Sequence, residues 1–129
     1  MKRLLLVLLL CLACPLWAAD VPHVTSRILL QSSPLAGFRY HEGKALWGEL
    51  KVGDALQLVR EPDNPYDPKA VRVDWQGHVL GYVPRAENAA VARQIDRGEK
   101  LEARIVKLRK SRNPRQRIEF DIYLPALNK

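Results

Sequence analysis

Apolar and polar positions alternate along several short stretches of this 129-residue chain, with the period of two that is typical of half-buried β-strands. Alternation and β-branched residues predict six strands, at residues 24–31, 55–60, 70–75, 78–83, 101–108 and 118–124. Gln76 and Gly77 separate the third strand from the fourth, and a two-residue turn of this kind predicts a β-hairpin.

A different periodicity occurs between Pro84 and Gly98, where apolar residues such as Val91 and Ile95 recur at helical spacing. Proline at the start and glycine at the end are common helix boundaries, so one α-helix is predicted here. Residues 38–51 fit either a short helical turn or a loop that caps the core, and the pattern does not choose between them.

Six strands, one helix and short connections predict a mainly β domain built as a small closed or partly open six-stranded barrel. The chain is long enough for one core of ordinary size and too short for a second.

The N-terminal segment has the order of a signal peptide. Lys2 and Arg3 precede an apolar run at residues 4–12, and small residues follow it. The run is shorter than the roughly 20 residues that a spanning helix needs, so no stable membrane span is expected. Residues 1–19 are therefore interpreted as a signal peptide and residues 20–129 as the mature domain, which is expected to be periplasmic or secreted.

Both cysteines, Cys11 and Cys14, lie inside the predicted signal peptide. The mature domain is then expected to have no disulfide, no cysteine nucleophile and no thiolate metal ligand. An alternative is a lipoprotein in which Cys14 becomes the lipidated first residue. Ala13 supports this alternative, whereas Cys11 occupies a position where such signals usually carry leucine.

The charge balance favours anionic partners. The full chain carries a net charge of +7, and loss of Lys2 and Arg3 leaves 19 of the 21 basic residues against 14 acidic ones, a net charge of +5. Such a balance suits nucleic acid, lipopolysaccharide or an anionic lipid surface, although solubility alone would also account for it.

Two segments carry a more specific pattern. Residues 35–40 read LAGFRY and residues 60–73 read REPDNPYDPKAVRV, with the predicted hairpin directly after them. Together they resemble the HIRAN domain family over nearly the whole mature chain. The resemblance implies an OB-like six-stranded β-barrel, which occurs alone in bacteria and fused to Swi/Snf-type helicases in eukaryotes. In such a helicase the domain captures the free 3′-hydroxyl end of single-stranded DNA.

The resemblance also implies roles for individual residues. Tyr40 and Tyr66 would sandwich the terminal base, Asp67 would accept a hydrogen bond from the 3′-hydroxyl, and Arg39 would hold a phosphate. Tyr82 is a further candidate ligand-binding residue, although it stands where the family has a phosphate-contacting histidine.

A purely structural interpretation of the same residues stays open. Tyr66 could pack against Pro65, Asp67 could cap its own turn, and Arg39 could pair with Glu42 or Glu61. His41 departs from the family pattern, which has a second tyrosine at that position.

A basic loop is expected between the last two strands. Its cations are Lys107, Arg109, Lys110, Arg112, Arg115 and Arg117, with no acidic residue among them. Clustered cations of this kind can follow a phosphate backbone with salt-dependent affinity, or they can form a solvated, self-repelling loop.

Enzymatic motifs are not evident in the sequence. It contains no nucleophile elbow, phosphate-cradling glycine loop or paired catalytic carboxylates, and His23, His41 and His78 are too scattered to suggest a metal site. The domain is expected to be non-enzymatic, without metal or cofactor. Trp47 and Trp75 are expected to belong to the core rather than to a ligand platform.

The leading hypothesis is a nucleic-acid-binding module that captures single-stranded DNA 3′ ends or another polyanion. The alternative is an envelope module that binds a protein partner or an anionic glycan or lipid, and a secreted nuclease ranks last for want of clustered metal ligands. End capture needs both candidate tyrosines exposed and parallel, whereas the alternative tolerates one buried tyrosine.

Overall fold

The computed structural model describes residues 26–113 and 117–125 of the chain. The predicted signal peptide, both cysteines and Arg115 of the basic loop lie outside the described residues.

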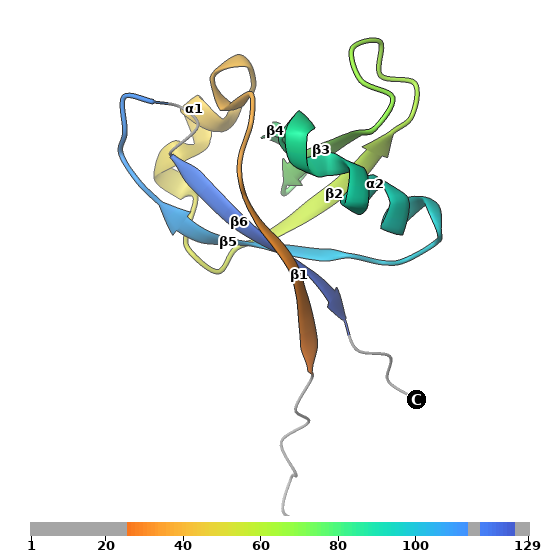
Figure 1. Ribbon diagram of the computed structural model, residues 1–129. Helices are drawn as coiled ribbons and strands as arrows, with labels where there is room; N and C mark the ends of the chain where they lie inside the picture. The colour runs from red at the N-terminus through yellow and green to blue at the C-terminus, as the bar shows by residue number, and fades with distance from the viewer. Residues whose placement is uncertain (1–25, 114–116, 126–129) are drawn as a thin grey trace, which may run out of the picture.

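An antiparallel six-stranded sheet dominates the described chain, and its strand order is β1-β6-β5-β2-β3-β4 (Figure 1). The strands are β1 (Arg27–Pro34), β2 (Ala55–Glu61), β3 (Ala70–Trp75), β4 (His78–Tyr82), β5 (Glu102–Leu108) and β6 (Ile118–Pro125). The sheet is strongly curled, and the prediction of a mainly β, OB-like domain is confirmed.

Helical segments connect the strands. They are the α-helices α1 (Gly43–Leu46) and α2 (Asn88–Asp96) and the 3-10 turns η1 (Phe38–Tyr40), η2 (Trp47–Glu49) and η3 (Arg85–Glu87). Residues 38–51, which the sequence pattern left open, therefore form a series of short helical turns. The predicted helix at residues 84–98 begins with the turn η3 and continues as α2.

Local chemistry explains two of these connections. Gln76 and Gly77 both have positive φ angles, 46° and 80°, as the tight turn of the predicted β3–β4 hairpin requires. Gly43 lies so close to Phe38 that a β-carbon there would come within 2.2 Å of the phenyl ring. A glycine at this position lets α1 pack directly on the core.

The core lies inside the curl of the sheet, and α2 contributes Val91 and Ala92 to it. Its largest fully buried side chains include Phe38, Phe120, Leu80 and Ile122. Trp75 is 6% exposed and belongs to the core as expected. Trp47 is only half-buried, and its ring meets that of Phe38 edge-on with 5.8 Å between centroids.

The two edges of the curled sheet meet at one pair of residues beyond β1. Ala36 and Tyr82 exchange two backbone hydrogen bonds of 2.9 Å, which join the segment after β1 to the end of β4. We call this pair the seam. Gly81 lies beside it, and a β-carbon on Gly81 would approach the Ala36 carbonyl oxygen to 2.2 Å.

Candidate functional site

A groove of about 500 Å³ opens next to the seam. The residues that line it include Tyr40, Tyr66, Asp67, Tyr82, Arg85 and Asn88. We call it the tyrosine groove. Four of the five ligand-binding residues expected from the sequence thus meet at one place, although they come from η1, the β2–β3 loop and β4.

Both candidate tyrosines are unusually exposed for aromatic residues, Tyr40 by 77% and Tyr66 by 85%. Tyr40 closes the turn η1, where its backbone N–H donates to the carbonyl of Gly37 at 3.0 Å. Gly37 has a φ of 75°, a conformation that glycine adopts without strain. The high exposure of Tyr66 argues against the interpretation that its ring packs against Pro65.

The loop that carries Tyr66 is held in shape by Asn64. The Asn64 Oδ1 atom accepts hydrogen bonds from the backbone N–H groups of Tyr66 at 2.9 Å and Asp67 at 3.2 Å. Its Nδ2 donates to Glu61 Oε1 at 3.1 Å. Asparagine is favoured in turns because its side chain can bond the backbone ahead of it in this way.

Asp67 is the acid of the tyrosine groove, and both of its carboxylate oxygens accept hydrogen bonds. The backbone N–H of Lys69 donates to Oδ1 at 2.9 Å, and the side chain of Asn88 donates to Oδ2 at 2.7 Å. These bonds, with the nearby charge of Arg85, hold the pKa of Asp67 below its ordinary value. Asp67 therefore caps its turn and is also an ionised acceptor, since each oxygen keeps a second lone pair.

Arg39 lies on the same turn as Tyr40, exposed, with its guanidinium carbon 5.9 Å from the tyrosine ring centroid. Within the described residues it forms no ion pair with Glu42 or Glu61. Both acids are engaged elsewhere, because Glu42 binds the N–H of Val79 and Glu61 pairs with an arginine of β3.

Tyr82 lines the groove with its ring, but its hydroxyl donates to Glu61 Oε1 at 2.8 Å. Burial and this carboxylate raise the pKa of Tyr82. With its proton committed to Glu61, the hydroxyl can only accept further hydrogen bonds, so it cannot donate to a phosphate in this arrangement.

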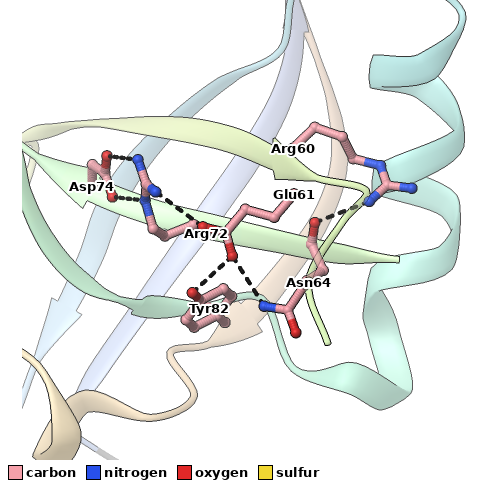
Figure 2. Close-up of polar contacts among 7 residues, drawn as sticks. Arg60, Glu61, Asn64, Arg72, Asp74 and Tyr82 are labelled. Atoms are coloured by element: carbon pink, nitrogen blue, oxygen red, sulfur yellow. Dashed lines mark hydrogen bonds and ion pairs between the residues drawn. The ribbon is translucent and has the colours of Figure 1, made fainter. Parts of the chain in front are cut away.

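Glu61 is the centre of a polar frame that includes Asn64 and Tyr82, two residues that line the groove (Figure 2). Its Oε2 accepts from Arg72 Nη1 at 2.9 Å, while Oε1 accepts from Asn64 and Tyr82. Arg72 also donates two hydrogen bonds to the carboxylate of Asp74, at 2.8 and 2.9 Å. Partial burial alone would raise the pKa of Glu61, but the three donors outweigh it and hold that pKa below the ordinary value.

This frame predicts acid-sensitive stability. Because the folded-state pKa of Glu61 is lowered, its contribution is complete above the ordinary glutamate pKa of about 4.3 and is lost as the pH falls through the folded value. Glu61→Gln should lower the free energy of unfolding by about 1–2 kcal/mol at pH 7. In urea unfolding from pH 7 to pH 3, the gap between wild type and variant should shrink below about pH 4. The exposed Glu99→Gln should match wild type throughout, and a gap independent of pH would contradict this role of the Glu61 charge.

The sequence pattern missed Arg85 and Asn88. Arg85 is exposed and lines the tyrosine groove, and Asn88 is 2% exposed at the first residue of α2. A signal was present, since both follow the predicted hairpin within a few residues. Nothing in the local pattern showed that the turn η3 would return to the β2–β3 loop.

The basic loop joins β5 to β6 as predicted, but none of its described residues lines the tyrosine groove. Lys110, Arg112 and Arg117 face a second groove beside α1. Lys107 lies exposed in β5, and Arg109 pairs through its backbone N–H with the carbonyl of Arg117 at 2.8 Å.

Among the described residues, no three histidine, cysteine or acidic side chains gather as a metal site would require. No helix in that part of the chain is long and apolar enough to cross a bilayer.

Comparison with known protein families matches residues 28–126 to the HIRAN domain. The chain belongs to the HIRAN domain family. This HIRAN protein is 32% identical over 77 residues to the Fanconi-associated nuclease 1 homolog of Oryza sativa subsp. japonica. That match covers 57% of this chain but only 8% of the relative, so this chain corresponds to a small part of the rice protein.

Two crystal structures share the HIRAN fold of this chain. A protein from Lactobacillus plantarum superposes with a TM-score of 0.66 and 30% identity, covering 76% of this chain and 94% of its own. The HIRAN domain of human HLTF gives a TM-score of 0.55 at 20% identity, with 77% of each chain covered, and this likeness concerns the fold alone.

Proposed function

We propose that this HIRAN protein is a non-enzymatic nucleic-acid-binding module that captures the 3′ ends of single-stranded DNA in the tyrosine groove. Membership of the HIRAN family supports the nucleic-acid-binding part of the proposal. The observation that carries the finer part is the pair of exposed tyrosines, Tyr40 and Tyr66, beside the ionised Asp67 in one groove.

The chemistry of such a site is straightforward. A nucleobase that stacks on an aromatic ring gains about 1–3 kcal/mol whatever its sequence. The remaining lone pairs of the Asp67 carboxylate accept a hydrogen bond from a free hydroxyl, whereas its negative charge repels a terminal phosphate. Arg85 within the groove and Arg39 at its margin supply positive charge for the phosphodiester group that precedes the terminal sugar.

A 3′-hydroxyl oligonucleotide should therefore bind more tightly than the same oligonucleotide with a 3′-phosphate. Asp67→Asn should lower affinity for the hydroxyl end about tenfold, because a hydrogen bond to a charged acceptor contributes about 1.5–3 kcal/mol. It should also narrow the difference between the two ends, since the repelling charge is gone. Fluorescence anisotropy with labelled oligonucleotides at low and moderate salt measures both effects.

Asp63→Asn is the matched control, because Asp63 is an exposed acid of the same loop that does not line the tyrosine groove. It should bind like wild type. Equal binding of both ends by the wild-type protein, or no binding at all, would contradict end capture. The groove would then belong to the alternative envelope module for a protein partner or an anionic glycan or lipid.

We further propose that the protein acts outside the cytoplasm, in the periplasm or as a secreted protein, on the basis of the N-terminal sequence pattern. DNA released or taken up at the cell envelope would supply the ligand. Subcellular fractionation tests this proposal, and recovery of the protein with the cytoplasm would refute it.

A further inference from the structure

A second groove, of about 460 Å³, lies between α1 and the basic loop. The residues that line it include Phe38, Lys44, Trp47, Lys110, Arg112 and Arg117. We call it the cationic groove. No acidic side chain of the described chain lines it, so four positive charges surround an opening that also contains aromatic surface.

Three of these cations have no acidic partner among the residues that the structure describes. Lys44, Lys110 and Arg112 are exposed and form no ion pair within the described residues. Like charges held together without counter-charges repel one another, and an anionic ligand relieves that repulsion. The cationic groove is therefore matched to a ligand with several negative charges.

The fourth cation is held in place. The Arg117 side chain donates through Nε to the backbone carbonyl of Ser111 at 2.8 Å, and its guanidinium carbon lies 5.7 Å from the Phe38 ring centroid. The Phe38 ring also meets that of Trp47 edge-on. Phe38 is fully buried, so the half-buried Trp47 is the ring of this groove that a base can reach. An accessible ring beside fixed positive charge is what single-stranded nucleic-acid sites use, because the ring stacks on a base while cations follow the backbone.

The turn η1 contributes a lining residue to each of the two grooves. Phe38 at its start lines the cationic groove, and Tyr40 at its end lines the tyrosine groove. Arg39 is exposed between them. Figure 1 shows α1 beside the loop that joins β5 to β6, with the β2–β3 loop on the other side of the fold. This turn therefore offers a path from the tyrosine groove to the cationic groove for a strand whose end occupies the first.

We infer that the cationic groove binds phosphodiester groups of the same DNA strand on the 5′ side of the captured end, with Trp47 as a surface for an upstream base. This inference rests on the proposed capture of 3′ ends. It assigns Lys110, Arg112 and Arg117 of the basic loop to upstream contacts and makes affinity depend on the length of the strand.

The test compares a 3′-hydroxyl dinucleotide with a 3′-hydroxyl octanucleotide over a series of salt concentrations. The double variant Lys44→Gln/Arg112→Gln removes two exposed cations. Neither forms an ion pair within the described residues, so the fold should not depend on their charge. For the octanucleotide, affinity should fall about tenfold. The plot of log K against log salt should become shallower by about 1.4, because each of the two lost phosphate contacts contributes roughly 0.7 to the steepness of the slope. Affinity for the dinucleotide should not change.

Arg97→Gln/Lys100→Gln is the matched control, because it removes the same charge from exposed positions after α2 that line neither groove. It should behave like wild type with both ligands. Equal losses for the two double variants, or for the two ligands, would overturn the inference, since charge at a distance would then suffice.

Failure of the inference is distinguishable from failure of end capture. If the wild type prefers a 3′-hydroxyl while Lys44→Gln/Arg112→Gln binds the octanucleotide normally, end capture stands and the cationic groove is refuted as an upstream site. If the variant lowers octanucleotide affinity although the wild type ignores the chemistry of the end, the cationic groove binds DNA but the upstream assignment is overturned together with end capture.

Discussion

The variant Tyr40→Ala/Tyr66→Ala is expected to bind single-stranded DNA 3′ ends about 100-fold more weakly than wild type. Each ring should contribute about 1–3 kcal/mol of stacking, so loss of both leaves the terminal base without a platform. The two side chains are 77% and 85% exposed, and their removal takes little apolar surface out of the core. Anisotropy titration gives the affinity, and a thermal melt should show an unchanged midpoint.

The conservative variant Tyr40→Phe/Tyr66→Phe separates stacking from hydrogen bonding. It keeps both rings and removes both hydroxyls, so affinity within about threefold of wild type is expected if stacking dominates. A loss as large as that of the alanine variant would show that the hydroxyls, rather than the ring faces, hold the ligand. Full retention of affinity by the alanine variant would refute the tyrosine groove as the site.

Gly81→Ala is expected to destabilise the fold by about 3 kcal/mol, because the new β-carbon would lie 2.2 Å from the Ala36 carbonyl oxygen. That oxygen accepts the Tyr82 N–H across the seam. Relief of the clash must move backbone on one side of the seam, which weakens its hydrogen bonds. In a domain of this size the melting temperature should fall by on the order of 10 °C.

Gly48→Ala is the matched control for Gly81→Ala. A β-carbon on Gly48 would meet nothing within 4 Å, and its φ is not in the positive range. Its stability should stay the same or rise by up to about 1 kcal/mol, because alanine restricts the unfolded chain. An equally stable Gly81→Ala would mean that the Ala36 segment shifts at little cost and that the seam is not closely packed.

Much of the fold was predictable because its strands are short and are bounded by turn residues that lie next to them in the sequence. The Gln76–Gly77 turn, for example, determines the β3–β4 hairpin through two adjacent residues alone. Residues 38–51 were not predictable, because Gly43 packs against the ring of Phe38 five residues earlier and this contact leaves no helical repeat in the sequence. The seam was equally hidden, since an isolated bridge leaves no periodic pattern.

The candidate site was predictable in part for the same reason. Tyr66 and Asp67 lie in a segment whose prolines and asparagine indicate a turn, and family resemblance singled out Tyr40. Arg85 and Asn88 could not be placed, because their position depends on how η3 and α2 return to the β2–β3 loop. The basic loop was correctly located between the last two strands, but nothing in the sequence showed that its described cations would line a groove other than that of the tyrosines.

The bonds that Asn64 makes to its own loop have a thermodynamic consequence. Ordering one residue of a flexible loop costs about 1–2 kcal/mol, and a loop that becomes ordered only on contact must subtract that cost from its affinity. Here Tyr66 and Asp67 are already fixed through their backbone N–H groups. Ligand association should therefore show little conformational entropy loss from the protein and proceed without a slow rearrangement step, as in preorganised recognition.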